Sequence, residues 1–250
     1  PRPCGRDRAP GAPVPRARAY GEMAGARIGR AVPAGETVDL LIMASSIPDI
    51  TPGRATTTYL SHVCPGGPLS FAISDQGTAA GFTGLRLVRE YARGGGFPRA
   101  LLIVVEQSWL AYDPGVPAAV PSGHTGVALL FGDADADGDG DAAAGLGPVR
   151  VRTDGRLPAL DDAQAAIVGA VLKGEAESFS ACADVTFASP GRPTTGVWWE
   201  LAGVLDQDAA RPRTEGRRIV LADADPDLGF RCTAAIDLPG QLSLPDTPSS

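Results

Sequence analysis

The sequence predicts an α/β protein with a duplicated, layered α/β/α/β/α architecture. Continuous apolar runs at 38–44 and 100–105 are typical of strands that are buried on both faces of a sheet. Segments with helical periodicity lie between such runs, which favours parallel or mixed sheets covered by helices. The two halves of the chain repeat a similar order of strands and helices, so we expect an internal duplication.

The first half is expected to hold three helices and four strands. The helices are expected at 20–32, 56–62 and 79–91, and the strands at 38–44, 69–74, 100–105 and 126–131. Three consecutive glycines at 94–96 end the third helix, because glycine is unfavourable within helices.

The second half is expected to begin with a strand at 149–151 and to continue with an amphipathic helix at 161–172, for which Asp161 is the N-cap. Further strands are expected at 184–188, 218–222 and 230–236, with a helix at 195–205. The predicted boundaries are a flexible arm at 1–17, an N-terminal half at 18–148, a C-terminal half at 149–237 and a disordered tail at 238–250.

Composition argues against several classes of protein. The formal net charge is −7, which disfavours general binding of nucleic acid. No apolar run approaches the length of about 20 residues that a membrane span needs, and the first residues lack the apolar core of a secretory signal. The 4 cysteines are widely spaced without a CxxC pair, so neither a zinc site nor a disulfide framework is indicated. We therefore expect a cytoplasmic protein with no membrane, nucleic-acid or metal partner.

The segment at 71–82, FAISDQGTAAGF, carries the main functional signal. A short apolar strand runs into a turn of small residues, and the turn opens a helix with Phe82, Leu85, Val88 and Tyr91 on one face. This geometry directs the turn at a helix N-terminus, where free backbone N–H groups favour negative charge, and it is a common way to build a nucleophile elbow. The turn contains no cysteine, so a scaffold of catalytic type lacks its expected nucleophile.

Four segments in matching order, and a closing pair, carry a family resemblance. They are SSIPD at 45–49, LSFAIS and AGF around the turn, ALLIVVEQ at 100–107, VALLFGD at 127–133, and the closing pair RIVLADADPDLGF and FRCTAAID. Together they resemble the type III β-ketoacyl synthases of the thiolase fold. The resemblance implies a duplicated thiolase-like fold that is shortened at its N-terminus, since the family's first strand has no clear counterpart before Tyr20.

The sequence departs from this family at all three catalytic positions. In the family, a cysteine at the elbow carries the acyl group, and a histidine and an asparagine polarise the thioester carbonyl. Two alignments of the longer turn place Ala79 or Gly77 at the nucleophile, and neither supplies a thiol. The regions of the family's histidine and asparagine read DVTFAS at 184–189 and SPGRPTTG at 189–196. No histidine follows His124 and the chain has no asparagine, so the Cys-His-Asn machinery cannot be assembled.

Gln76, Ser74 and His124 are the candidate catalytic residues. In related ketosynthases, a glutamine at the nucleophile position marks decarboxylating or chain-length partner subunits that are not acylated. The Gln76 amide could donate a hydrogen bond to a thioester or enolate oxygen. Ser74, like Thr78, is a candidate hydroxyl nucleophile, and His124 is a candidate general base or oxyanion donor. Each residue also has a structural alternative. Gln76 would be a turn residue that bonds the backbone, Ser74 or Thr78 would cap the helix, and His124 would be exposed without a catalytic role.

The candidate substrate-binding residues are three elbow residues and one tryptophan: Gly77, Thr78, Ala79 and Trp198. Trp198 and Trp199 adjoin on an expected helix, so their side chains point about 100° apart. One is expected in the core, and the other along a cleft or an interface.

Three further features have competing interpretations. Cys64 is either a displaced nucleophile or an inert buried thiol. The acidic run DADADGDGD at 133–141 matches the first ligand positions of an EF-hand loop but lacks the closing glutamate, so a solvated acidic connection is favoured over a calcium site. Arg86, Arg89 and Arg93 are either contacts for phosphopantetheine or a carrier protein, or a solvated helix face.

The function implied by the resemblance is the handling of acyl thioesters in polyketide or other specialised metabolism. The substrate would be carried by an acyl carrier protein or coenzyme A, with no further cofactor. The resemblance implies pairing through the strand at 69–74, in a homodimer or in a heterodimer with a ketosynthase. The first interpretation is a non-acylating partner subunit of an active ketosynthase. The alternatives are a reprogrammed enzyme (acyl transfer, decarboxylation or lyase chemistry) that uses Ser74, Gln76 or His124, and a non-catalytic module that binds an acyl group or small ligand.

Overall fold

The computed structural model describes residues 19–50, 55–110, 115, 119–132, 145–157, 160, 163–211 and 214–240. The expected arm at 1–17 and the acidic run at 133–141 lie outside the described residues, as does the expected tail beyond Gly240. Leu238, the first residue of that expected tail, is the last residue of a strand.

The first sheet contains β1 (Leu40–Ser45), β2 (Leu69–Ile73), β3 (Ala100–Glu106) and β4 (Thr125–Phe131) in the order β2-β1-β3-β4. β1 is parallel to β2 and β3, whereas β4 is antiparallel to β3. The helices of this half are α1 (Tyr20–Ala31), α2 (Thr56–Val63) and α3 (Ala79–Arg93). Every element of this half lies within two residues of its predicted bounds, so these predictions are confirmed.

The second sheet contains β5 (Leu146–Arg152), β6 (Ala165–Val168), β7 (Asp184–Phe187), β8 (Arg217–Asp225) and β9 (Phe230–Leu238) in the order β5-β9-β8-β6-β7. β6 is parallel to β7 and β8, and β9 is antiparallel to both β8 and β5. The helical elements of this half are the 3-10 helix η1 (Ala170–Phe179) and α4 (Gly196–Ala210).

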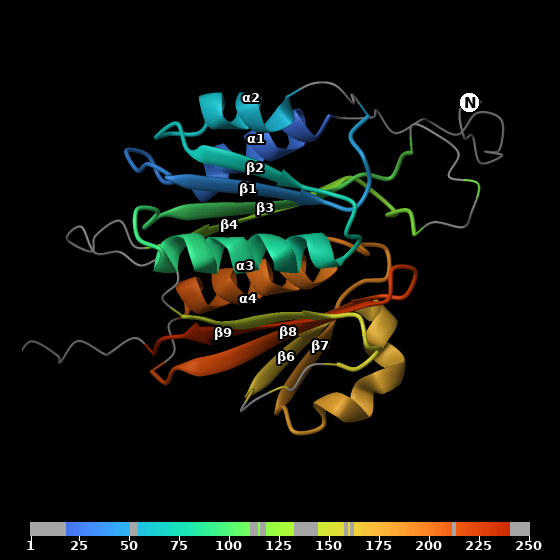
Figure 1. The fold of residues 1–250 in the computed structure, drawn as a ribbon. Coiled ribbons are helices and arrows are strands. Elements are labelled where there is room, and N and C mark those ends of the chain that lie inside the picture. Colours follow the sequence, from blue (N-terminus) through green and yellow to red (C-terminus); the bar gives the residue numbers. More distant parts are fainter. Residues whose placement is uncertain are drawn as a thin grey trace, which may run out of the picture.

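These elements form five layers (Figure 1). Helices α1 and α2 cover the outer face of the first sheet, and α3 and α4 lie between the two sheets. Helix η1 packs on the outer face of the second sheet, where Leu172 and Phe179 join a small apolar cluster. The predicted α/β/α/β/α architecture is therefore confirmed, including the placement of the two central helices between the sheets.

The helix expected at 161–172 is wrong, because strand β6 lies within that range. Its residues are buried on both faces: Ala165 and Ile167 face the core between the sheets, while Ala166 and Val168 face η1. A continuous apolar run of four residues with both faces covered favours a parallel strand. The expected helical periodicity combined this strand with the first residues of η1, which begins at Ala170.

The internal duplication is visible in the order of the strands. β1, β2, β3 and β4 of the first sheet correspond to β6, β7, β8 and β9 of the second, and α3 corresponds to α4. The strand expected at 149–151 lies within β5, which pairs with β9 at the edge of the second sheet, so this prediction is confirmed. Among the described residues, β4 has no such neighbour beyond β3.

The two halves meet where α3 and α4 contact each other. The fully buried indole of Trp198 on α4 packs against Phe82 of α3, with ring centroids 5.1 Å apart. A Cβ on Gly81 would lie 2.6 Å from the indole Nε1, so glycine is needed for this close approach. The contact fixes how the N-termini of the two helices face the opposite halves.

Candidate functional site

The turn between β2 and α3 has the geometry of an elbow. It leaves β2 at Ser74 and enters α3 at Ala79, which is fully buried. Asp75 has a φ of 62° and Gly77 a φ of 52°, both in the left-handed region that glycine tolerates best. This sharp reversal presents the first backbone N–H groups of α3 to the second half of the molecule.

Asp225, the last residue of β8, occupies the N-terminus of α3. Its Oδ2 accepts hydrogen bonds from the Thr78 backbone N–H at 3.1 Å and from the Thr78 hydroxyl at 3.4 Å. Its Oδ1 accepts from the N–H groups of Asp227 and Leu228 at 3.1 and 3.0 Å, which hold the carboxylate in its own turn. A Cβ on Gly77 would overlap this carboxylate, so the approach requires glycine.

Glu106, the last residue of β3, occupies the N-terminus of α4 in the same manner. Its Oε2 accepts from the backbone N–H groups of Thr194 and Thr195 at 2.9 and 3.2 Å, and its Oε1 accepts from the Thr195 hydroxyl at 2.5 Å. Burial raises the pKa of the Glu106 carboxyl, while these hydrogen bonds and the nearby charge of Arg192 oppose the rise. The Ser46 hydroxyl, 2.5 Å from that of Thr194, extends this cluster to the end of β1.

The two carboxylate caps are related by the internal duplication. β3 corresponds to β8 and α4 to α3, so each half supplies a carboxylate to the helix of the other half. A carboxylate at a helix N-terminus satisfies free N–H groups and interacts favourably with the helix dipole. At the elbow, a backbone N–H that could face a developing oxyanion is therefore bonded to a carboxylate of the chain itself.

Gln76 lies in the elbow with its side chain turned toward α3. Its Oε1 accepts a hydrogen bond from the Thr83 hydroxyl at 2.6 Å. Because the carbonyl oxygen is engaged in this way, the NH2 group is the part of the carboxamide that can donate to another molecule. The orientation is compatible with the expected role of Gln76 as a hydrogen-bond donor, which stays a prediction.

The other elbow candidates are engaged or buried. Ser74 is exposed, and its hydroxyl donates to the Asp75 carboxylate at 2.7 Å. A carboxylate is a much weaker base than the imidazole that usually activates such a hydroxyl. The Thr78 hydroxyl is bonded to Asp225, and Ala79 is enclosed in the first turn of α3.

His124 lies apart from the elbow. It immediately precedes β4, which is three strand positions from β2, or about 14 Å at the usual spacing of strands. Its Nδ1 accepts from the Ser108 N–H at 3.4 Å, and its Nε2 is buried without a partner among the described residues. The structure therefore does not bring His124 together with Gln76 or Ser74.

The adjacent tryptophans have the two environments that their spacing predicts. Trp198 is buried in the core, whereas Trp199 is 39% exposed and lines a groove of about 710 Å³ beside β4. The Arg192 guanidinium lies 4.2 Å from the centre of the Trp199 ring. This confirms the split between core and cleft, while the predicted substrate contact of Trp198 stays a prediction.

The described cysteines do not have the properties of reactive thiols. Burial raises the pKa of Cys64 to about 11 and that of Cys182 above its usual value. Burial also raises the pKa of Cys232 to about 12, and the charges of Asp223 and Asp225 add to this rise. Reactive cysteines have lowered pKa values, so the interpretation of Cys64 as an inert buried thiol is favoured over that of a displaced nucleophile.

Asp223 is a buried carboxyl group beside the α3 cap. It is 4% exposed, and its Oδ1 accepts a hydrogen bond from the Ala224 N–H at 2.8 Å. Burial raises its pKa to about 8, and the nearby charges of Asp225 and Glu106 contribute to the rise. Asp223 is therefore mostly protonated at neutral pH, in contrast to an ordinary surface aspartate.

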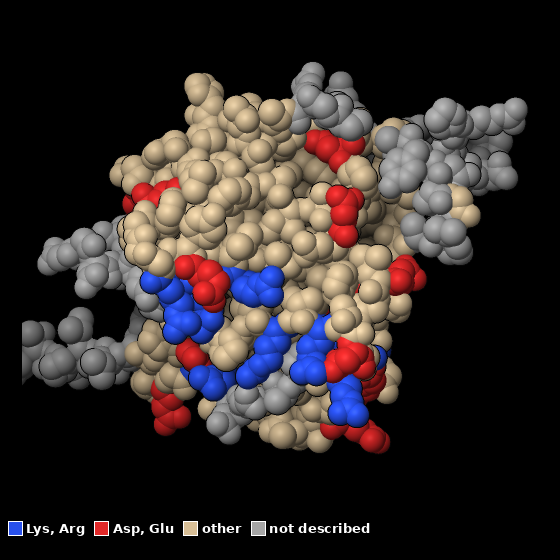
Figure 2. Space-filling view, in the orientation of Figure 1, with Lys and Arg blue, Asp and Glu red and all other residues tan. Residues whose placement is uncertain are grey.

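Arginine side chains gather on one part of the surface. Figure 2 shows blue side chains around and below α3, whereas the half of this face that carries α2 and β2 has few charges. Arg89 links the two halves, because its Nε donates to the Leu146 carbonyl at 3.1 Å, and it also forms an ion pair with Glu90. Arg86 and Arg93 are exposed on the same helix.

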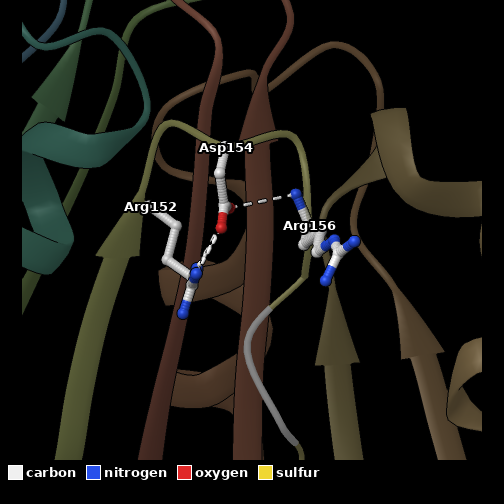
Figure 3. Close-up of polar contacts among 3 residues, drawn as sticks. All are labelled: Arg152, Asp154 and Arg156. Atoms are coloured by element: carbon white, nitrogen blue, oxygen red, sulfur yellow. Dashed lines mark hydrogen bonds and ion pairs between the residues drawn. The ribbon is translucent and has the colours of Figure 1, made fainter.

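The turn that follows β5 is held by its own charged residues (Figure 3). Arg152 forms an ion pair with Asp154, which also accepts a hydrogen bond from the Arg156 backbone N–H at 3.3 Å. Arg152 lowers the pKa of the Asp154 carboxyl to about 2. Both side chains are exposed, so this pair fixes a surface turn and contributes little to stability.

Two other features, a metal site and a membrane-spanning helix, have no support in the described part of the chain. No group of three or more His, Cys, Asp or Glu side chains there is arranged to hold a metal ion. Within the same residues, no helix is both long and apolar enough to cross a membrane. The acidic run at 133–141, expected to be a solvated connection, lies outside these residues.

Sequence reasoning missed the three carboxyl groups that organise the site: Glu106, Asp223 and Asp225. Glu106 and Asp223 directly follow apolar runs that were correctly predicted as strands, at 100–105 and 218–222, and Asp225 lies two residues beyond Asp223. Acidic residues at the end of a buried strand, where helix N-termini gather, are the signal that could have found them.

No family model and no curated protein matches the chain. Solved structures do match it. ChlB3, an acyltransferase, superposes with a TM-score of 0.66 at 14% identity, over 92% of this chain and 87% of its own. 3-Oxoacyl-(acyl carrier protein) synthase III from Pseudomonas aeruginosa PAO1 superposes with a TM-score of 0.59 at 18% identity, over 90% and 85%. The HMG synthase of the curacin biosynthetic pathway, solved in complex with holo donor-ACP, superposes with a TM-score of 0.56 at 15% identity, over 88% of this chain and 68% of its own.

These similarities show the fold. The chain has the thiolase-like fold of the type III ketosynthases and related enzymes. Within that fold it is divergent, since its elbow carries no thiol and its sequence contains no asparagine.

Proposed function

We propose that this protein is a non-acylating, ketosynthase III-like partner subunit that handles acyl thioesters in polyketide or other specialised-metabolite biosynthesis. The observation that carries the proposal is the elbow. Its turn has no thiol, and the Thr78 N–H at the start of α3 is bonded to Asp225. A subunit with this elbow would bind or orient a thioester for an active partner, without forming an acyl-enzyme.

Gln76 is the residue proposed to contact the thioester. Its carbonyl oxygen is held by Thr83, which leaves the NH2 group as a donor at the mouth of the elbow. Such a donor can stabilise an enolate or thioester oxygen even where no covalent intermediate forms. This arrangement also supports the second candidate function, a reprogrammed decarboxylase-like enzyme that would use Gln76 alone.

The proposed partners are an acyl carrier protein and a second ketosynthase-type subunit. β2 pairs only with β1 among the described residues, and Leu69 on β2 is 44% exposed. With Tyr59 and Val63 of α2, which are also exposed, Leu69 offers an apolar surface for pairing of subunits. The exposed Arg86 and Arg93 support a contact with the phosphate of a phosphopantetheine arm.

The test combines mass spectrometry with reconstitution. The protein is incubated with acyl-CoA and with acyl carrier substrates, alone and together with a companion ketosynthase that has an intact Cys-His-Asn triad. We expect no covalent adduct on this chain, no turnover by it alone, and turnover when the companion is present. Gln76→Ala should lower that turnover, whereas the matched Ser74→Ala should not.

An acyl adduct on this chain would contradict the non-acylating role and identify a relocated nucleophile. Turnover by the chain alone without an adduct would favour the reprogrammed enzyme. Binding of acyl substrates without turnover, even with a companion, would favour the simple binding module.

A further inference from the structure

The face of the molecule that carries α2, β2 and α3 is apolar in one half and basic in the other. In the half that holds α2 and β2, the side chains of Leu69, Tyr59 and Val63 are 44%, 50% and 40% exposed. Figure 2 shows few charges in this half and blue side chains around α3 below it. The exposed Arg86 and Arg93 lie on that helix. A subunit that pairs through β2 therefore also meets the arginines of α3.

Arg86 and Arg93 are the charges that such a subunit would meet. Glu90 lies between them on the helix surface, but it forms an ion pair with Arg89 at 3.1 Å. Within the described part of the chain, neither Arg86 nor Arg93 forms an ion pair. Exposed charges more than about 8 Å apart are largely screened at physiological ionic strength. These two local positive charges, rather than the net charge of −7, consequently decide which surface can approach.

The level of a two-fold axis on this face follows from a ring contact. Two copies that pair antiparallel through β2 are related by an axis normal to the sheet, so both α3 helices lie in one layer with their exposed faces opposed. β2 spans Leu69–Ile73, and its middle residue is Phe71. The Phe71 ring lies 5.5 Å from that of Tyr91 on α3. The axis of such a dimer would therefore pass α3 at the level of Tyr91.

A second copy would place the arginines against one another. At 1.5 Å of rise per residue, Arg93 lies about 3 Å beyond the level of Tyr91, and Arg86 about 8 Å before it. Along the helices, Arg93 of the second copy would be about 6 Å from Arg93 and about 5 Å from Arg86. The exposed carboxylate of Asp75 precedes α3, about 18 Å or more from this level, so it cannot neutralise them. Like charges this close oppose association, whereas acidic side chains on the opposing helix would form ion pairs.

We propose that the face formed by β2 and α3 excludes a second copy of this chain and accepts an unlike ketosynthase-type subunit with acidic side chains opposite α3. The inference rests on the proposed function, because it specifies the chemistry of the partner that pairs through β2. The apolar side chains of α2 and β2 provide contact area, and Arg86 and Arg93 provide the selection between partners. The phosphate contact proposed above is an alternative use of the same two arginines.

The test supplies the acidic helix from the chain itself. The double variant Arg86→Glu, Arg93→Glu carries the opposite charges on the same face. By sedimentation velocity at low salt, we expect the wild type alone and the variant alone to be mainly monomeric. Their equimolar mixture should form a mixed dimer with a Kd about tenfold or more below that of either protein alone. A higher salt concentration should weaken the mixed dimer, because salt screens its ion pairs.

Two control variants locate the effect on this face. The double variant Arg30→Glu, Arg211→Glu makes the same change of charge at exposed positions on α1 and at the end of α4. It should not dimerise with the wild type. Leu69→Asp in the wild-type member should abolish the mixed dimer, because it places a charge in the apolar half of the face. Urea unfolding midpoints check that each variant is folded.

Three results would overturn the inference. The first is a wild-type homodimer as tight as the mixed dimer, and the second is a mixture that does not associate. The third is a mixed dimer that persists with Leu69→Asp, because the two chains would then pair elsewhere. Loss of holo carrier protein binding in the charge-reversed variant, without a mixed dimer, would assign the arginines to the phosphate contact instead. The dimer measurements use no acyl thioester and no companion ketosynthase, so the proposed role in thioester handling is tested separately by reconstitution.

Discussion

Replacing Asp223 with asparagine should change how the stability of the protein depends on pH. The carboxyl is 4% exposed, and burial raises its pKa from the ordinary 3.8 to about 8. The substituted carboxamide would keep the size of the side chain and an oxygen that accepts from the Ala224 N–H. The substitution would remove the ionisable group at position 223.

The sign follows from proton binding in the two states. Between about pH 4 and pH 8, the folded protein keeps the Asp223 proton and the unfolded chain loses it. The free energy of unfolding therefore falls as pH rises through this window, by up to about 1.4 kcal/mol per pH unit. At pH 7, about three pH units above the ordinary pKa of an aspartate, the protonated Asp223 has lowered the free energy of unfolding by on the order of 4 kcal/mol. The carboxamide of Asp223→Asn has a second N–H, and burying it without a partner costs about 1–3 kcal/mol. This cost offsets part of the stabilisation expected from the substitution.

The assay is urea unfolding, followed by tryptophan fluorescence, at several values between pH 5 and pH 8. We expect the stability of Asp223→Asn relative to the wild type to increase steadily with pH. Asp227→Asn makes the same change on an exposed side chain of the following turn and should track the wild type. Parallel stability curves for Asp223→Asn and the wild type would refute the reasoning, because Asp223 would then be ionised in the folded state.

Three further predictions concern the caps and the thiols. Asp225→Ala should lower the free energy of unfolding in urea by about 1–3 kcal/mol, because the Thr78 N–H loses its acceptor. Asp225→Asn should lower it less. Equal stability of both variants and the wild type would show that the cap is unimportant. Glu106→Gln should destabilise by a similar 1–3 kcal/mol or so, since one acceptor oxygen of a buried cluster becomes a donor, and an unchanged unfolding midpoint would argue against the cap on α4. Cys64 should resist iodoacetamide in the native protein at neutral pH and react after unfolding; rapid native labelling would restore it as a candidate nucleophile.

Most of the fold could be predicted because its strands are short apolar runs with clear limits. The run at 100–105 became β3, and glycines at 94–96 marked the end of α3 close to Arg93. The error at 161–172 arose where a strand of four residues adjoins a 3-10 helix, since a window long enough to detect helical periodicity covers both. The position of β5 depends on pairing with β9, whose paired residues lie 79 to 90 positions later, and local patterns do not report such pairing.

The site was harder to predict than the fold, because its contacts join distant parts of the chain. The elbow at 71–82 was found from a local pattern of strand, turn and helix. Its partner Asp225 is 147 residues from Thr78 in sequence, and Glu106 is 88 residues from Thr194. No local pattern records such pairs. His124 was a candidate because it is a histidine in a loop just before a strand, and the order of the strands separates it from the elbow.

The carboxylate beside the elbow opposes thiol chemistry at this turn. A cysteine introduced at position 79 would sit one residue from the N–H that Asp225 holds, and a neighbouring negative charge disfavours a thiolate. Recovery of a nucleophile would need at least two substitutions, of which the removal of Asp225 carries a folding penalty by itself. A substitution at position 79 alone would therefore give an unreactive sulfhydryl, and removal of Asp225 alone would give a less stable fold.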